Sequence, residues 1–258
     1  MKHAQILDKL AAKHLVSCLE TEVLLAVESA LVTLRYDADT NVSYHVLSAL
    51  MPRWRARQDD PIFQVALVVL LHKYGIAEPD TTTSGVNAIR LLNQNVQLSD
   101  AFARQESRMI RLLCDPPTPL NRRPKRPAPL SFYRPGDVVV FFYQGVYISA
   151  YIDGDVGVNE APILEFYEGV FTTQPSYEQL ASLRAYGVAN PEDGTHLSRS
   201  RYAVFHMTYL PDLAQQITLI ASGIEQGPRT DHLKPSLYAY VVSDILRLQT
   251  LLGNISQR

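Results

Sequence analysis

The feature that most constrains the fold is a proline-rich basic segment near the middle of the chain, at residues 115–129 (DPPTPLNRRPKRPAP). It holds six prolines and four basic residues. Prolines at this density prevent regular secondary structure, and the charges keep the segment in water. The sequence therefore predicts two domains, residues 1–114 and 131–258, joined by a linker at residues 115–130. The 258-residue chain is 47% hydrophobic, so each domain has enough apolar side chains for its own core.

The segment before the linker has the pattern of helices alone. Apolar residues recur every three to five positions over residues 4–35, which indicates an amphipathic helix. Asp59-Asp60-Pro61 is a typical helix start, and Gly75 is a typical helix end. The predicted helices cover residues 4–35, 43–54 (ending early if Pro52 stops it), 62–74, 83–92 and 99–113, with Thr83 or Ser84 and Ser99 or Asp100 as caps. The first domain is thus predicted to be an all-helical bundle or array.

The segment after the linker is rich in Val, Phe and Tyr in short runs, which favours strands. Gly145 and residues 153–155 (DGD) are expected to form turns, the first within a hairpin. The predicted strands cover residues 137–143, 146–152, 163–167, 201–208, 216–221 and 237–242, with helices at 175–183 and 243–252. The fold class is therefore an all-helical N-terminal domain followed by an α+β domain. The sheet of that second domain is predicted to be small and strongly bent, or a partly open barrel, and a C-terminal helix follows it.

Alternation along the predicted strands divides the sheet into two faces. One face is predicted to be core and carries Val146, Ile148, Ala150 and Ile152. The other is aromatic with an acidic group, and carries Tyr147, Tyr151, Glu165 and Tyr167. It either packs against the helical domain or the C-terminal helix, or it serves as a recognition surface. The first strand (DVVVFFY) is apolar on both faces, so the N-terminal helices or a partner must cover its second face.

Motifs of catalysis are absent from the sequence. It contains no G-x-G-x-x-G, no P-loop, no H-E-x-x-H and no G-x-S-x-G. The seven histidines are scattered, and Cys18 and Cys114 lack zinc-ligand spacing. We therefore predict no catalytic residue, no metal and no cofactor. The two cysteines are expected to be buried thiols in a reducing compartment, with an interhelix disulfide as the alternative.

Two other functions have some support in the residues. A hydrolase would use a pair of carboxylates from the group Asp153, Asp155, Glu165 and Glu168. A regulatory nucleic-acid binder would contact phosphates through the basic residues of the linker, which are Arg122, Arg123, Lys125 and Arg126. The net charge of −2 and the lack of aromatics among these basic residues favour a plain linker over nucleic-acid binding.

The sequence also indicates where the protein resides. Charged residues interrupt the first 16 residues, which excludes the apolar core of a signal peptide. The longest strongly apolar run, Val65 to Leu71, is too short to cross a bilayer. We predict a cytoplasmic protein that does not enter the membrane.

The start of the β-rich segment carries a recognisable order of features. Gly136-Asp137-Val138 opens a hydrophobic run, Gly145-Val146-Tyr147 begins a strand that reaches Tyr151, and Leu164–Tyr167 forms an acidic-aromatic strand before the short segment Pro175–Leu183. This pattern, over about residues 131–185, resembles the immunity proteins of bacterial polymorphic toxin systems, and among them immunity protein family 26. The resemblance implies an SH3-like barrel without catalytic residues that binds and neutralises a cognate protein toxin made by the same cell.

The resemblance also gives the aromatic-acidic face an expected role. Tyrosines are efficient anchors at protein interfaces, and acidic groups complement a basic nuclease surface. The predicted partner-binding residues are Tyr147, Tyr151, Glu165, Tyr167 and Glu168.

Overall fold

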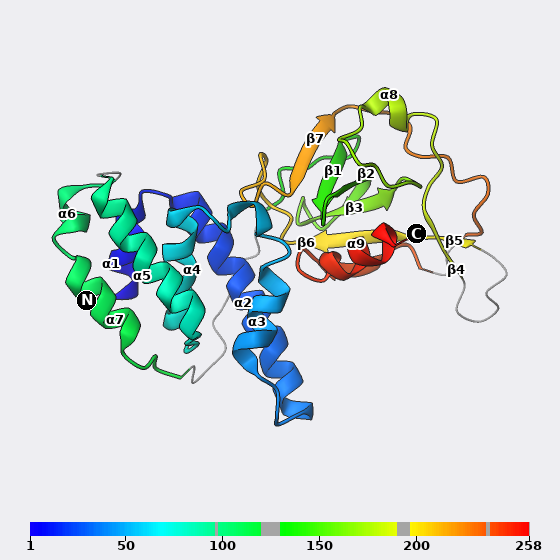
Figure 1. Cartoon of the computed structure of the whole chain (residues 1–258). Helices are drawn as coiled ribbons and strands as arrows, with labels where there is room; N and C mark the ends of the chain where they lie inside the picture. Colours follow the sequence, from blue (N-terminus) through cyan, green and yellow to red (C-terminus); the bar gives the residue numbers. More distant parts are fainter. Residues whose placement is uncertain (96–97, 120–129, 190–196, 236–237, 258) are drawn as a thin grey trace. The chain divides into compact units, whose positions relative to one another are not determined.

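The computed structural model describes residues 1–95, 98–119, 130–189, 197–235 and 238–257 (Figure 1). The chain divides into two compact units, Met1–Arg126 and Pro127–Arg258. The first is helical, and the second contains an open mixed sheet, a small hairpin and a C-terminal helix. The predicted fold class is confirmed. The sequence predicted either a bent sheet or a partly open barrel, and the structure has an open sheet.

The helical unit is built around one almost wholly apolar helix. Its elements are α1 (His3–Leu7), α2 (Lys13–Tyr36), α3 (Val42–Leu50), α4 (Pro61–Lys73), α5 (Pro79–Gln94), α6 (Asp100–Ala103) and α7 (Glu106–Cys114), with 3-10 turns at Asp8–Leu10 and Arg55–Arg57. The run from Val65 to Leu71 is buried along its whole length in α4. Helices α1, α2, α5 and α7 pack around α4, which explains why its apolar residues occupy every face.

Two predicted helices differ from those in the structure. The helix predicted over residues 4–35 is broken at Ala11, whose φ of 53° is left-handed. The apolar periodicity continues across the break because Leu7, Leu10 and Leu15 are all buried on either side of it. The helix predicted over residues 99–113 is divided into α6 and α7 at Arg104 and Gln105.

Helix α5 begins four residues before its predicted start. Glu78 is the N-terminal cap, and its carboxylate accepts hydrogen bonds from the backbone N–H groups of Asp80 (3.3 Å) and Thr81 (2.6 Å). Pro79 occupies the first helical position, where a missing N–H costs nothing. The predicted starts at Thr83 or Ser84 are therefore wrong, whereas Asp60-Pro61 starts α4 as predicted.

A buried ion pair holds α2 to the turn that follows α3. Glu22 on α2 is 1% exposed and lies 3.4 Å from the guanidinium of Arg53, which is 3% exposed. The indole N–H of Trp54 donates a 2.6 Å hydrogen bond to the same carboxylate. The Trp54 ring in turn stacks on Phe63 of α4 at 5.3 Å. This cluster joins three segments of the helical unit through one acidic side chain.

The β unit contains most of its strands in one sheet. Its elements are β1 (Val138–Tyr143), β2 (Val146–Val156), β3 (Ala161–Phe166), α8 (Tyr177–Leu180), β4 (Gly187–Ala189), β5 (Leu197–Arg199), β6 (Arg201–Phe205), β7 (Ile217–Ala221), β8 (Val241–Asp244) and α9 (Leu248–Ser256). The described strands of the sheet lie in the order β7-β1-β2-β3-β6-β8, with β6 and β8 parallel and the other pairs antiparallel. Strands β4 and β5, which the sequence did not predict, form a separate hairpin.

The predicted hairpin between β1 and β2 is confirmed, but the turn predicted at residues 153–155 is wrong. Gln144 and Gly145 have φ values of 49° and 91°, as a two-residue hairpin turn requires. Strand β2 continues through Asp153 to Val156, with a register shift between Ile152 and Gly154. A bulge of this kind takes up an extra residue without ending the strand.

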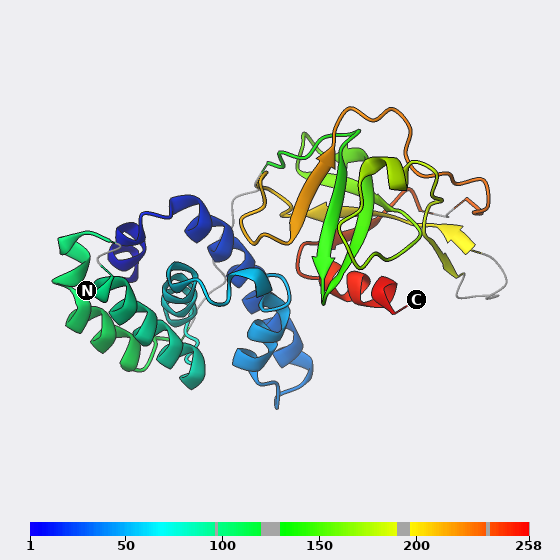
Figure 2. The ribbon, with the colours of Figure 1, turned by 45° about the horizontal axis from the view of Figure 1, so that its top comes forward.

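Both faces of the sheet are covered by elements of the β unit itself (Figures 1 and 2). Helix α9 packs on the face that carries Phe141 and Ile148, and Gly253 of α9 lies against the Tyr143 hydroxyl. On the other face, Val138 of β1 packs with Leu180 of α8 and with side chains that follow β3 and β7. The second face of β1 therefore needs no cover from outside the unit. Helix α9 starts five residues after its predicted start, because residues 243–244 belong to β8.

Candidate functional site

The predicted aromatic-acidic residues do lie on one face of the sheet. Tyr151 of β2 is directly opposite Glu165 of β3. The backbone N–H of Tyr167 donates a 2.9 Å hydrogen bond to the carbonyl of Ser149, which places Tyr167 next along the same face. The strand pairing on which the sequence prediction depended is therefore confirmed.

Most of this face is inaccessible to a partner, however. Tyr151, Glu165 and Tyr167 are 8%, 2% and 1% exposed. Tyr151 and Tyr167 belong to a core cluster with Val138 and Leu180, and the Tyr151 hydroxyl donates to the carbonyl of Ile224 at 3.1 Å. Burial raises the pKa of both tyrosines above its ordinary value. Of the five predicted partner-binding residues, these three are interior because α8 and the chain after β7 cover them.

Partly exposed aromatic side chains lie at one end of this face, and with two exposed residues close to Phe171 in the chain they make up what we call the aromatic patch. We use this term for Phe142, Tyr147, Glu168, Val170 and Phe171. Phe142 and Tyr147 are cross-strand neighbours whose ring centroids are 5.1 Å apart. Tyr147 also exchanges backbone hydrogen bonds with Phe171 in both directions, at 2.8 and 3.0 Å. Three segments of chain are thus held side by side at this end of the sheet.

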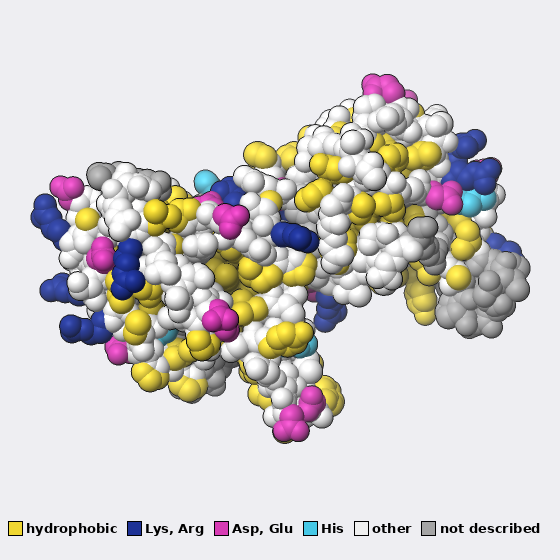
Figure 3. All heavy atoms as spheres, in the orientation of Figure 1, with side chains coloured by type: hydrophobic (Ala, Val, Ile, Leu, Met, Phe, Trp, Pro, Cys, Tyr) yellow, Lys and Arg dark blue, Asp and Glu magenta, His cyan; other side chains and the backbone are white. Residues whose placement is uncertain are grey.

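The patch presents large apolar groups to solvent beside an acid. Phe142 is 40% exposed and Val170 is 36% exposed, while Glu168 is also exposed. In the view of Figure 3, hydrophobic side chains gather over the sheet around β1 and β2. Sequence reasoning found Tyr147 and Glu168 but missed the other three residues. The signal for Phe142 was present in the doubly apolar first strand, where it shares the face of Tyr147.

A cluster of charges lies further along the buried face. The guanidinium of Arg199 on β5 makes a two-pronged contact with the Glu165 carboxylate, at 2.5 and 2.6 Å. Arg201 on β6 donates to Asp153 at 2.6 Å, and Asp153 also lies 3.5 Å from Arg199. The hydrogen bond that Arg199 donates to Glu165 raises the pKa of Arg199, with further contributions from the charges of Glu165 and Asp153.

This cluster bears on the predicted hydrolase group. Of the four carboxylates in that group, Asp153 and Glu165 lie in the cluster, and both are bound by arginines. Asp155 accepts instead from the backbone N–H of Asn159 at 3.0 Å, and Glu168 belongs to the aromatic patch. Ion pairing favours the charged form of a carboxylate, whereas one member of a hydrolytic pair must hold a proton. No observation in this group therefore favours hydrolysis.

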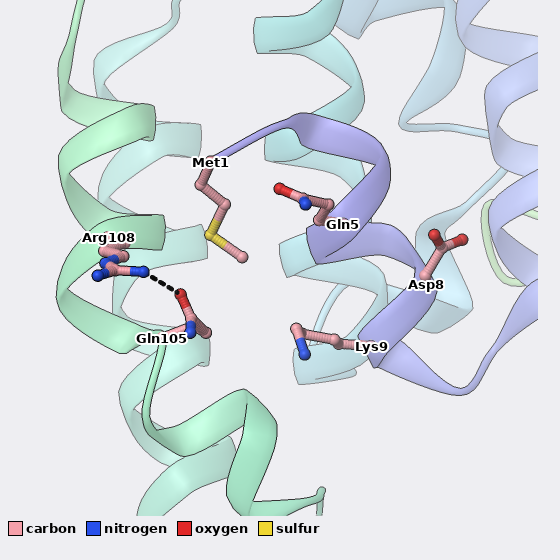
Figure 4. A pocket seen from close by; sticks show the side chains of 6 residues that line it. All are labelled: Met1, Gln5, Asp8, Lys9, Gln105 and Arg108. Atoms are coloured by element: carbon pink, nitrogen blue, oxygen red, sulfur yellow. Dashed lines mark hydrogen bonds between the residues drawn. The ribbon is translucent and has the colours of Figure 1, made fainter.

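A cationic pocket opens beside the charge cluster. It has a volume of about 290 Å³ and is lined by Arg199, Arg201, Thr230, Leu233, Lys234, Pro235, Tyr238 and Ala239. A second hollow, of about 670 Å³, lies in the helical unit between α1 and the start of α7. Its lining is Met1, Gln5, Asp8, Lys9, Gln105 and Arg108 (Figure 4). Arg108 there donates a 3.4 Å hydrogen bond to Gln105, and Asp8 points away from Met1.

The remaining predictions concern the linker, metals, cysteines and membranes. Arg122, Arg123, Lys125 and Arg126 lie outside the described residues. The described residues hold no group of three His, Cys, Asp or Glu side chains that could bind a metal ion. They also include no helix long and apolar enough to cross a bilayer. Both cysteines are free thiols, so the disulfide alternative is wrong, and Cys114 is exposed while Cys18 is buried.

Comparisons with known proteins give no relative. No protein-family model matches the chain, and neither a curated protein nor a solved structure does so.

Proposed function

We propose that this protein is an immunity-type protein that binds and neutralises a protein toxin, and that the aromatic patch is its contact surface. The observation that carries the proposal is the exposure of Phe142, Val170 and Glu168 together with the partial exposure of Tyr147. The resemblance of residues 131–185 to bacterial immunity proteins supports the same class of function. The four other residues of the patch would act with Tyr147 as one surface.

The patch has the chemistry that protein interfaces favour. Aromatic side chains supply a large contact area with few rotatable bonds, and they are enriched among the residues that contribute most to binding. Glu168 adds a negative charge at the edge of the patch, which suits a basic toxin surface and would raise the rate of association.

The patch is also fixed before a partner arrives. Tyr147 and Phe171 are held by paired backbone hydrogen bonds, and the backbone N–H of Glu168 donates to the carbonyl of Arg184 at 2.7 Å. A contact surface that is already ordered loses little conformational entropy on binding.

The test begins with the gene next to this one, which the proposal expects to encode the protein toxin. The toxin and this chain are expressed together, and cell survival is measured for the wild type, Tyr147→Ala and Glu168→Lys. The matched control is Tyr44→Ala, which removes another exposed tyrosine, 73% accessible, from the helical unit. We expect the wild type and Y44A to protect the cells, and Y147A and E168K to lose protection.

Circular dichroism shows whether each variant is folded. If folded Y147A and E168K protected the cells fully, the aromatic patch would not be the contact surface. Failure of the wild type to protect against the neighbouring toxin would overturn the proposed function itself.

A further inference from the structure

We propose that the cationic pocket of the β unit binds a small phosphate-bearing molecule. The pocket lies between the ends of β5 and β6 and the described residues 230–235 and 238–239. Its basic lining residues are Arg199, Arg201 and Lys234. This ligand site is separate from the aromatic patch, so it does not depend on the proposed toxin binding.

Two of the three cations are held in place from behind. Glu165 occupies two N–H groups of Arg199, and Asp153 occupies one N–H group of Arg201. A guanidinium has five N–H donors, so each arginine keeps donors for a ligand in the pocket. Arg199 and Arg201 are 31% and 28% exposed at their side chains, whereas Glu165 is 2% exposed. Glu165 thus lies behind Arg199 and positions it, while Asp153, which is 27% exposed, holds Arg201 at the surface.

Lys234 supplies a charge that the carboxylates do not balance. Its backbone N–H donates to the carbonyl of Leu197, and its carbonyl accepts from the N–H of Arg199, both at 2.9 Å. These bonds fix the lysine beside β5. Within the described part of the chain, no carboxylate lies within ion-pair distance of its ammonium group. Among the lining residues and the carboxylates that bind them, Arg199, Arg201 and Lys234 thus stand against Asp153 and Glu165.

The arrangement suits phosphate better than a carboxylate. The lining of the pocket supplies three cations, Arg199, Arg201 and Lys234, and a phosphate monoester has three free oxygens that can accept from them. The doubly negative phosphate also gains more than a singly charged carboxylate from a site with excess positive charge. A volume of about 290 Å³ limits the ligand to a phosphate with a small attached group.

The test uses the full chain with inorganic phosphate as the probe. Binding is measured by isothermal titration calorimetry at constant ionic strength, with sodium acetate in place of phosphate as the carboxylate comparison. The variant is Lys234→Ala, because this lysine takes no part in the ion pairs of the cluster. The matched control is Lys13→Ala, which removes an exposed lysine from the helical unit.

We expect saturable phosphate binding by the wild type and by K13A. Loss of one charge-assisted hydrogen bond should weaken it by about tenfold or more in K234A. Absence of saturable phosphate binding by the wild type overturns the proposal, as does equal weakening in K13A and K234A. Acetate binding as tight as phosphate binding overturns the assignment to phosphate.

Discussion

Each unit contains a glutamate that is almost fully buried and paired with an arginine, and the two pairs differ in the exposure of the arginine. Arg53, the partner of Glu22 in the helical unit, is 3% exposed. Arg199, the partner of Glu165 in the β unit, is 31% exposed and lines a pocket. The first pair is sealed on both sides, so it can act on the fold alone. The second presents one member to solvent, so it can both support the fold and receive a ligand.

The largest expected effect is at the sealed pair. Glu22→Gln keeps the shape of the side chain but removes the buried charge that Arg53 and Trp54 contact. Breaking one side of a buried ion pair costs about 3–5 kcal/mol of unfolding free energy. Trp54 is the sole tryptophan of the chain, so its fluorescence during urea unfolding follows the helical unit alone. An exposed ion pair contributes up to about 1 kcal/mol. A loss of unfolding free energy below that value would contradict the burial of the Glu22–Arg53 pair.

The corresponding change in the β unit should cost less. In Glu165→Gln the freed guanidinium of Arg199 remains hydrated at the pocket, so the loss should be near that of a single hydrogen bond to a charged group, about 1–3 kcal/mol. Hydrogen exchange of amides in β2 and β3 measures the stability of this unit. If E165Q lost as much unfolding free energy as E22Q, the Glu165–Arg199 pair would be as shielded from solvent as the Glu22–Arg53 pair.

A third contact between ionisable side chains lies in the helical unit. His3 of α1 and His72 of α4 are joined by a 2.8 Å hydrogen bond between Nε2 of His3 and Nδ1 of His72. Nε2 of His72 lies 2.9 Å from the carbonyl oxygen of Asp115. A carbonyl can only accept, so His72 donates from Nε2.

Acid should therefore weaken the helical unit. Burial, and then the nearby His72 and Lys73, lower the pKa of His3 below its ordinary 6.5. Below pH 6.5 the unfolded chain takes up a proton at His3 that the folded chain does not, so the unfolding free energy falls as the pH decreases. We expect the Trp54 urea midpoint to fall between pH 7.5 and pH 5.5, and to fall less in His3→Gln. Equal pH dependence in both proteins would exclude this contact as its source.

The smallest effect on stability is expected at the open side of the β-unit pair. Lys234→Ala should change the unfolding free energy by no more than about 0.5 kcal/mol, because its side chain lies at an exposed position. The same change should reduce the rise in melting temperature that phosphate gives the wild type, because K234A binds phosphate more weakly. A large loss of stability without phosphate would instead make Lys234 part of the fold.

Local patterns in the sequence were sufficient for the architecture. The proline-rich segment separated the two parts, Asp60-Pro61 marked the start of α4, and the Gln144-Gly145 turn marked the first hairpin. Each of these signals acts over a few residues. The bulge at Asp153 was missed because its cause is an arginine 48 residues away, whereas an Asp-Gly-Asp sequence by itself favours a turn.

The sequence predicted only part of the candidate site, again because local patterns do not show contacts between distant segments. Alternation along β2 and β3 gave the shared face of Tyr147, Tyr151, Glu165 and Tyr167, since side chains of paired strands follow a period of two. Which end of that face is open depends on α8 and on the chain after β7, which cover Tyr151 and Tyr167 from distant parts of the sequence. The partner of Glu165, Arg199, lies in a strand that was not predicted.

The most direct test of the central claim, that the aromatic patch binds a protein toxin, is the dissociation constant of the complex. It is measured by calorimetry for the neighbouring toxin with the wild type, Y147A and Y44A. We predict that truncation of an anchor tyrosine in Y147A raises the dissociation constant by about thirtyfold or more, which corresponds to about 2 kcal/mol, while Y44A leaves it unchanged. An unchanged dissociation constant for folded Y147A would contradict the account.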